Sequence, residues 1–189
     1  MKKRGMIFID GSNVYYDWQR LNRTKPLDIQ KYVAVVQNLY PDVEFVRSYY
    51  FATETSSNST FIHSIRKIPY LDVVTGRLQS KEISLDKLGV QCPSCGRNLF
   101  GHASTQVDKG TDINIAVEIL THAFNDSFDL AILASRDSDF VSVVKVVKHL
   151  GKNIEAVLFE NAQHNALELT ESVDNVCLIH ATEYANCER

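Results

Sequence analysis

The sequence predicts an α/β protein built on a mostly parallel sheet, and three features indicate this. Short apolar runs typical of buried strands recur along the 189 residues, amphipathic segments separate most of them, and acid-rich turns follow two of the runs. Alternation of this kind places helices on both faces of a sheet through right-handed crossovers. No repeat, low-complexity tract or linker interrupts the chain, so we expect a single domain over residues 1–189.

The first half of the chain alternates strand and helix. Residues 5–10 form an apolar run that closes with Asp10-Gly11-Ser12-Asn13, the pattern of a buried parallel strand ending in a loop. Residues 28–40 carry apolar side chains at helical spacing, with Asp28 as the expected N-cap. The next expected elements are a strand at 43–51, a loop at 53–59, a helix at 60–68 and a strand that begins at Val73.

Residues 76–108 are predicted to be an insertion, because helical and strand periodicities both fade there. The segment holds Cys92-Pro93-Ser94-Cys95-Gly96, which is half of a zinc knuckle. Two interpretations are equally weighted: two free thiols in a turn, or a Zn²⁺ site completed by His102 and a fourth ligand that the sequence does not identify. The insertion is also the expected contact for a protein partner or for a homo-oligomer.

The second half of the chain returns to regular periodicity. The expected elements are a helix at 111–124, a strand at 128–134, a helix at 140–150, a strand at 154–159, a helix at 162–173 and a last strand at 176–179. Strand and helix alternate to the end, which supports the sheet predicted from the first half.

Composition and charge exclude several classes of protein. The longest apolar runs fall far short of the ~20 residues that cross a bilayer, and the basic start leads into only four apolar residues before Asp10, so neither a membrane span nor a signal peptide is expected. Four cysteines do not make a disulfide framework, which favours a cytoplasmic location. The formal charge of −3 gives no general attraction for a polyanion, so local basic groups or bound cations must supply it.

Four aspartates are expected to meet at one edge of the sheet. Two acid-rich turns follow strands and a third opens a helix: 10–13, 135–140 and 109–112. Ligands of open α/β sheets bind at the carboxyl ends of the central strands, so Asp10, Asp112, Asp137 and Asp139 converge if the two strands are neighbours. Taken singly, each aspartate is an ordinary turn or helix-start residue.

Taken together, the four aspartates predict a cation. Unit charges about 4 Å apart repel by roughly 4 kcal/mol at an effective dielectric near 20. An all-oxygen ligand set suits hard ions such as Mg²⁺ or Mn²⁺, which accept phosphate oxygens and activate water.

The three motifs, Asp10-Gly11-Ser12-Asn13, Lys109-Gly110-Thr111-Asp112 and Ser135-x-Asp137-Ser138-Asp139-Phe140, resemble those of the NYN domain, a PIN-like nuclease family, and its LabA/DUF88 branch in particular. The resemblance covers nearly the whole chain. It implies a three-layer, Rossmann-like PIN fold with strand order 3-2-1-4-5, and a metal-dependent ribonuclease site at the four aspartates with Asn13 beside them. Arg136 stands where the family usually has glycine.

The leading hypothesis is therefore a metal-dependent endoribonuclease that acts on RNA. Asp10, Asp112, Asp137 and Asp139 hold Mg²⁺ or Mn²⁺, and Asn13 orients a ligand or a water molecule. The residues expected on the substrate side are Ser12, Lys109, Ser135 and Arg136. The alternative is a non-catalytic module that binds RNA or a nucleotide in the same acidic pocket, or docks a protein through the insertion.

Aromatic and basic residues near the first turn also have two interpretations. Tyr15, Tyr16 and Trp18, with the cations of 20–25 and 66–67, either track and stack a single strand or form core aromatics beside a solvated helix face. Arg136 likewise has two expected roles: it grips a phosphate, or it pairs with the four aspartates in place of a cation.

Overall fold

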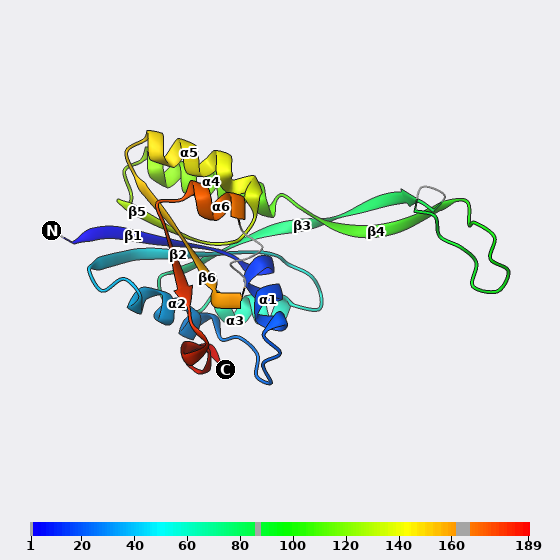
Figure 1. The fold of residues 1–189 in the computed structure, drawn as a ribbon, viewed down its shortest axis with the longest axis horizontal. Coiled ribbons are helices and arrows are strands. Elements are labelled where there is room, and N and C mark those ends of the chain that lie inside the picture. Colours follow the sequence, from blue (N-terminus) through cyan, green and yellow to red (C-terminus); the bar gives the residue numbers. More distant parts are fainter. Residues whose placement is uncertain (1, 86–87, 162–166) are drawn as a thin grey trace.

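The computed structural model describes residues 2–85, 88–161 and 167–189. Within these residues seven strands form one sheet, flanked by helices on both faces, and a long two-stranded arm projects from the body (Figure 1). Among the described helices, none is long and apolar enough to cross a membrane.

The elements follow one another along the chain as the sequence alternation indicates. Their order is β1 (Lys3–Asp10), α1 (Gly11–Arg20), α2 (Ile29–Asn38), β2 (Val43–Thr53), α3 (Ser59–Ile65), β3 (Leu71–Ser84), β4 (His102–Lys109), α4 (Thr111–Phe124), β5 (Leu130–Ala134), η1 (Ser138–Phe140), α5 (Val141–His149), β6 (Asn153–Phe159), α6 (Leu167–Ser172), β7 (Asn175–Ile179) and η3 (Ala181–Cys187).

The sheet confirms the predicted α/β class. Its order is β4-β3-β2-β1-β5-β6-β7, and every pair is parallel except β3 with β4. The central strands β3-β2-β1-β5-β6 follow the expected 3-2-1-4-5 order, while β7 and the antiparallel β4 extend the sheet at its two edges. The chain order reverses at β1, which lies between β2 and β5, so the carboxyl end of β1 is the switch point where ligands bind in such sheets.

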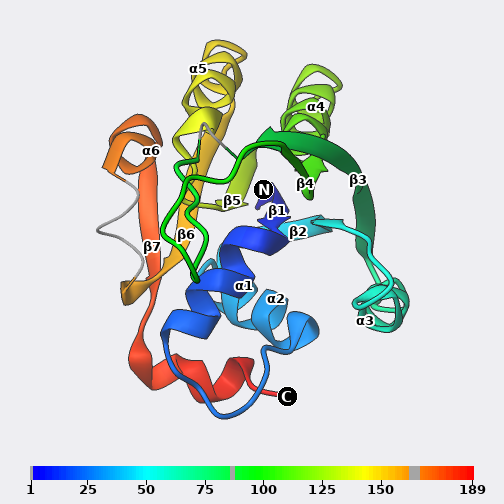
Figure 2. The ribbon, with the colours of Figure 1, turned by 90° about the vertical axis from the view of Figure 1, so that its right-hand side faces the viewer.

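Two apolar cores, one on each face of the sheet, hold the layers together. One core contains Trp18 and Tyr32 from α1 and α2, and the other contains Ile115 and Val144 from α4 and α5. Figure 2 shows these two helix pairs on opposite sides of the strands. The centre of β1 is buried on both sides, which is why residues 6–9 are all apolar.

Residues 76–108 were expected to lack regular structure, but much of this segment forms two long strands, β3 and β4. The first part of β3 pairs with β2 as far as Gly76, and the strand then continues from Arg77 to Ser84 as an antiparallel partner of β4. Most side chains of this ribbon are exposed on both of its faces. Strand periodicity was absent from the sequence because neither face of the ribbon needs to be apolar.

Three further differences concern helices. The sequence did not predict α1, which follows the first acid-rich turn directly, nor η3 at the C-terminal end. Of the helix expected at 162–173, residues 162–166 lie outside the described residues, and α6 covers Leu167–Ser172.

Candidate functional site

Asp10 lies at the centre of the candidate site. It ends β1 and caps α1, and only 1% of its surface is exposed. Its Oδ1 accepts a hydrogen bond from the Asn13 backbone N–H at 3.1 Å, and its Oδ2 accepts from the Asn13 side-chain amide and from the Ser135 hydroxyl at 3.0 Å. Burial raises the pKa of Asp10, and the charge of Asp137 raises it further. The hydrogen bonds from Asn13 and Ser135 lower it in part. The result is a carboxylate held rigidly and short of compensating charge.

Gly11 makes the turn after Asp10 possible. A Cβ at this position would lie 2.5 Å from the Phe51 carbonyl oxygen and 2.6 Å from the Tyr50 hydroxyl. Only glycine allows the backbone to pass so close to the end of β2. The Asp-Gly pair therefore sets where the buried carboxylate points.

The turn after β5 is tied to Asp10 through Ser135. The Ser135 hydroxyl donates to Asp10 and accepts from the Asp137 backbone N–H at 3.1 Å, while Asp137 Oδ1 accepts from the Asp139 backbone N–H at 2.9 Å and caps η1. The sequence suggested that Ser135 contacts the substrate. Because Ser135 is buried, its role in the structure is to position Asp10. Asp137 is half-buried and Asp139 is exposed, both on the turn that adjoins Asp10.

Asp112 comes from the first turn of α4, which brings a third segment to the same edge. Gly110 precedes the helix with a positive φ of 94°, a conformation that favours glycine. The Thr111 hydroxyl donates to Asp108 at 2.9 Å, which fixes the approach of β4 to the helix. Partial burial raises the pKa of the Asp112 carboxyl, and Asp10 and Asp137 raise it further. Asp108, which the sequence did not single out, contributes to the same negative potential.

The donor set fits a hard divalent cation that keeps part of its water shell. The charges of Asp10, Asp137 and Asp139 each raise the pKa of Asp112, so the four predicted carboxylates interact electrostatically. Within residues 2–85, 88–161 and 167–189, however, no three or more His, Cys, Asp or Glu side chains are grouped closely enough to hold an ion directly. Mg²⁺ retains several waters and needs only one or two direct carboxylates, which is consistent with this spacing.

Arg136 pairs with Asp17 of α1, and no ion pair of the described residues joins it to any of the four aspartates. Its Nε lies 3.1 Å from Asp17 Oδ1, with 19% and 7% of the two side chains exposed. Burial raises the pKa of Asp17, whereas the charges of Arg136 and Arg20 lower it. Sequence reasoning missed Asp17, although Asp10, Asn13 and Asp17 share the spacing of one helix face.

The remaining predicted contacts divide between solvent and an adjoining cavity. Lys109 is exposed at the end of β4, and Ser12 is exposed on the first turn of α1. Ser12 borders a cavity of about 580 Å³, whose lining includes Tyr16, Tyr50 and Phe61. This cavity begins at Gly11, directly beside Asp10, so an aromatic pocket adjoins the acidic edge.

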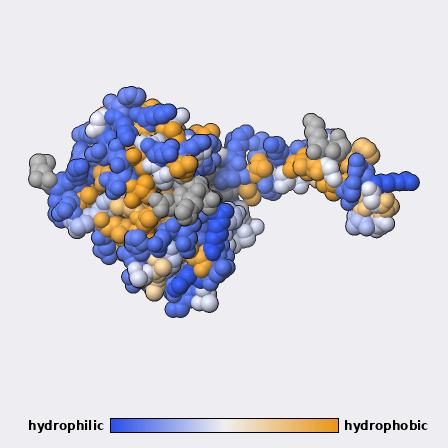
Figure 3. All heavy atoms as spheres, viewed as in Figure 1, coloured by the Kyte–Doolittle hydropathy of each residue, from blue (hydrophilic) through white to orange (hydrophobic). Residues whose placement is uncertain are grey.

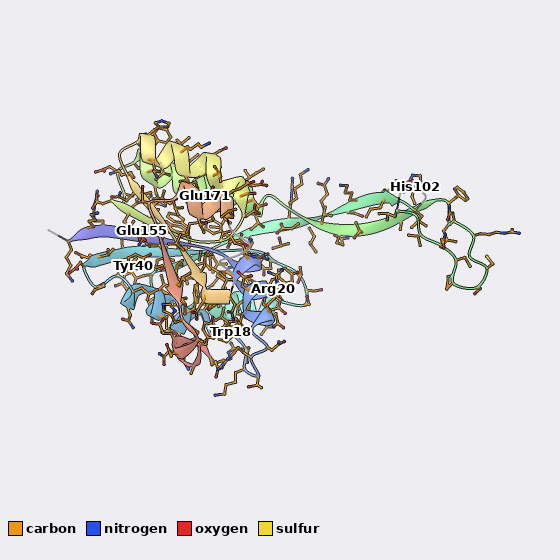
Figure 4. All side chains as sticks on the ribbon, in the orientation of Figure 1. Trp18, Arg20, Tyr40, His102, Glu155 and Glu171 are labelled. Carbon is orange, nitrogen blue, oxygen red and sulfur yellow. The ribbon has the colours of Figure 1, made fainter. Side chains whose placement is uncertain are left out.

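Trp18 belongs to the core, in agreement with one of its two interpretations. It is buried, and its indole N–H donates to the Lys25 carbonyl oxygen at 3.0 Å. Figure 4 shows Trp18 and Arg20 on the same helix within the body. Several nearby cations are already paired with carboxylates: Arg20 with Asp17, Arg23 with Glu188 and Arg66 with Glu54. Tyr15 and Tyr16 are about half exposed and pack edge to face on each other, which leaves ring surface open to solvent.

Residues 91–98, which include Cys92 and Cys95, form the far end of the arm, remote from the acidic edge (Figure 1). Hydrogen bonds from the Ser94 and Cys95 backbone N–H groups to the Cys92 sulfur lower the pKa of that thiol. His102 begins β4, where the ribbon ends. Among the described residues, neither it nor any other side chain joins the two cysteines as a third metal ligand.

One solved structure of low sequence identity shares this architecture. A Vibrio parahaemolyticus protein of unknown function, known from a crystal structure, is similar at a TM-score of 0.62 and 19% identity, with 94% of this chain and 93% of that chain covered. A possible 1-phosphofructokinase from Thermotoga maritima is similar at a TM-score of 0.43 and 11% identity, over 94% of this chain and 57% of that one. No curated protein sequence matches the chain.

The first of these similarities supports the fold alone, since identity is low. The family model of the NYN domain matches residues 4–180, which include all of the described sheet except the first residue of β1, together with all three acid-rich turns. The chain therefore belongs to the NYN domain family of PIN-like nucleases.

Proposed function

We propose that this protein is a metal-dependent endoribonuclease whose site is the acidic edge at the carboxyl ends of β1 and β5. Asp10, Asp112, Asp137 and Asp139 would hold Mg²⁺ or Mn²⁺, some of them through water. The motifs favour the LabA/DUF88 branch of the family. Membership of a nuclease family supports the hydrolase class, and the local charge arrangement supports the metal dependence.

The buried carboxylate of Asp10 is the observation that carries the proposal. Burial and a neighbouring aspartate disfavour its charge, whereas three donor groups from Asn13 and Ser135 favour its ionised form. A purely structural cap would gain nothing from further carboxylates nearby, because each adds repulsion. A cation removes that repulsion, so binding of one accounts for the arrangement.

A divalent ion supplies positive charge to a phosphate and makes a water molecule more acidic. The chain's own residues then have distinct tasks. Asn13 and Ser135 fix Asp10, Asp137 is fixed by its bond from the Asp139 backbone, and the phosphodiester lies over the edge they form. Attack of water in line on phosphorus breaks the bond to the 3′ oxygen and leaves 5′-phosphate and 3′-hydroxyl ends.

The cavity beside Gly11 supports a single-stranded substrate. Its lining combines the aromatic rings of Tyr16, Tyr50 and Phe61 with the hydroxyl of Ser12. Unpaired bases stack on such rings without sequence preference. A net charge of −3 weakens general attraction for RNA, so we expect binding to depend on the divalent ion as well as on stacking.

The experiment is cleavage of labelled single-stranded and structured RNA by the purified chain in Mn²⁺, Mg²⁺ or EDTA, with single-stranded DNA as a parallel substrate. We expect cleavage of RNA in at least one metal and none in EDTA. Asp10→Asn, Asp112→Asn and Asp137→Asn should each reduce cleavage by about 100-fold or more, since each removes a negative charge that would hold the ion directly or through water.

The matched control is Asp42→Asn, because Asp42 is exposed in the turn before β2, at the opposite edge of the sheet. It should cleave at the rate of the unchanged chain. Equal activity in EDTA and in metal, or full activity of all three site variants, would overturn the proposal.

Binding of RNA without cleavage is the second candidate. It is favoured by the spacing of the acidic residues, because no three of the described metal-ligating side chains converge on one point. If RNA binds in the presence of Mn²⁺ or Mg²⁺ and stays intact with every substrate, this candidate replaces the nuclease.

A further inference from the structure

The tip of the arm projects away from the helices of the body (Figure 1). Residues 77–84 and 102–109 form a two-stranded ribbon that carries the tip away from the body (Figure 1). An isolated ribbon of two strands is marginally stable in water. A contact at the end of the arm would therefore stabilise it.

The tip itself is folded into a cysteine knuckle. The Cys92 backbone N–H donates to the Arg97 carbonyl oxygen at 2.8 Å, and the Gly96 N–H donates to the Cys92 carbonyl oxygen at 2.9 Å. Gly96 takes a positive φ of 70° to close the turn. The Ser94 and Cys95 backbone amides point at the Cys92 sulfur, and the Cys95 thiol lies beside it. Two sulfurs are therefore adjacent, with amides aimed at one of them, which is the arrangement that supports a bound thiolate.

This knuckle supplies half of a tetrahedral zinc site. Structural zinc takes four ligands, commonly four thiolates. The chain's other two cysteines, Cys177 and Cys187, lie in β7 and η3 of the body. Among the described side chains nothing joins Cys92 and Cys95 as a third ligand, His102 included. One chain thus offers two thiolates at a place where two more are needed.

We propose that the missing pair comes from a second copy of this chain, so that two arm tips meet tip to tip around one Zn²⁺. A two-fold axis through the ion makes the contact self-complementary and closed, as in most homodimers. On binding, the four thiols lose their protons to solvent and the four sulfurs coordinate the ion. This proposal is independent of the nuclease proposal, since the acidic edge takes no part in it.

The surface around the knuckle suits such a contact. Its exposed apolar side chains are Leu88, Val90, Leu99 and Phe100, the last with 80% of its surface exposed. Figure 3 shows hydrophobic residues gathered along the outer part of the arm. Clustered apolar exposure of this kind marks a contact surface. Paired tips would bury these side chains against their counterparts.

Charge at the tip also fits a second copy. Residues 88–101 contain a single ionisable side chain apart from the two thiols, namely that of Arg97. Zinc with four thiolates carries two net negative charges. Two copies bring two Arg97 side chains next to the knuckles, because the Arg97 backbone is bonded to that of Cys92. The pair of guanidinium groups would offset the charge of the centre.

The test measures zinc content and mass together on the purified, reduced full-length chain. Zinc chloride alone is added and the excess is removed. We expect about one zinc ion per two chains, and a dimer by light scattering that reverts to monomer when a chelator removes the zinc. Substitution by cobalt should give the absorption of a tetrahedral site with four sulfur ligands.

Three variants sharpen the test. Cys92→Ser with Cys95→Ser should bind no zinc and stay monomeric, while it cleaves or binds short RNA as the unchanged chain does. Cys177→Ser, which also removes one thiol, is the matched control and should dimerise normally. His102→Ala should keep both the zinc and the dimer.

Several outcomes would overturn the proposal. One zinc ion per monomeric chain, lost in His102→Ala, would show a site completed within one chain. A dimer that survives chelation and is lost on addition of reductant would show disulfide linkage. A monomer without zinc under all these conditions would leave two free thiols at the tip.

Discussion

The acidic edge and the arm tip both gather potential metal ligands, but they are built in opposite ways. Asp10 is held by two buried strands, a helix N-terminus and three donor groups, all from the same chain. Cys92 and Cys95 are held by a short turn on an exposed ribbon. All the groups that hold Asp10 at the acidic edge come from one chain. The arm tip offers two thiols, whereas a structural zinc ion needs four ligands.

This difference shows that positioning and ligand number are separate requirements. The body provides rigidity, because its central strands β1 and β5 are buried on both faces and transmit any displacement to the side chains at their ends. The arm provides reach, because its ribbon carries two thiols beyond the body. We therefore expect changes in the body to alter folding and catalysis together, and changes in the arm to alter assembly alone.

The largest expected effect comes from Gly11→Ala. The added Cβ would lie 2.5 Å from the Phe51 carbonyl oxygen, a backbone atom that cannot move aside cheaply. We expect a loss of about 3 kcal/mol in the free energy of unfolding, together with loss of cleavage because Asp10 is displaced. Denaturant unfolding measures the first effect and the RNA assay the second.

The matched change in the arm is Gly89→Ala. Nothing in the described structure lies within 4 Å of a Cβ added there, although φ at Gly89 is +62°. The backbone strain stays within the tip, so the unfolding transition of the body should not shift. If the two alanine variants unfold alike, the contrast between a supported edge and an independent arm is wrong.

The second largest effect concerns the ion pair that sequence reasoning missed. Arg136→Gln leaves the buried Asp17 carboxylate with Arg20 as its one cationic neighbour among the described residues. We expect a loss of about 2 kcal/mol at neutral pH, since an uncompensated buried charge is costly. Arg47→Gln is the control: it breaks an exposed pair with Asp72 and should cost less than about 1 kcal/mol.

The pH dependence of this loss has a definite sign. Burial already raises the pKa of Asp17 above its unfolded value, and removal of Arg136 raises it further. The folded state then disfavours the charged form, so the destabilisation is full above the folded pKa and fades as falling pH protonates Asp17. Unfolding of both chains at about pH 7 and about pH 4.5 should show the difference shrinking. A difference that does not change with pH would assign the effect to lost packing.

The sequence predicted the parts of the molecule whose causes are local. Buried strands show as apolar runs, and the residues at their carboxyl ends, Asp10 and Asp137 among them, followed from that pattern. The sequence did not predict the two-stranded ribbon, because exposed strands need no alternation of apolar and polar residues. The sequence did not predict the ion pair of Arg136 with Asp17, because the two residues are distant in sequence. They come together because β1 and β5 are neighbours in the sheet.

Asn13→Ala tests how far the edge depends on its supports. The variant removes the side-chain amide that donates to Asp10 Oδ2 and keeps the backbone N–H that donates to Oδ1. We expect cleavage to fall about 10–100-fold with little change in RNA binding, because Asn13 acts through Asp10. Asn186→Ala, an exposed change in η3, is the control and should be inert. Equal loss of RNA binding would place Asn13 on the substrate instead.

The smallest expected effect is on stability in Asp112→Asn. The Asp112 carboxyl is partly buried and faces the charges of Asp10 and Asp137, which together raise its pKa. The folded state therefore disfavours its ionised form, and the metal-free protein loses stability as pH rises from the unfolded pKa through the folded one. Removal of this charge should stabilise the metal-free chain by about 0.5 kcal/mol at neutral pH, a small value because solvent reaches the partly buried side chain and screens its charge. Added Mn²⁺ should raise the unfolding midpoint of the unchanged chain more than that of the variant.

Asp10→Asn should gain less stability than Asp112→Asn in the same metal-free measurement, because an asparagine amide at position 10 loses an acceptor for Asn13 or Ser135. Destabilisation in Asp112→Asn without metal would mean that Asp112 supports the start of α4 and that the carboxylates at this edge do not repel one another.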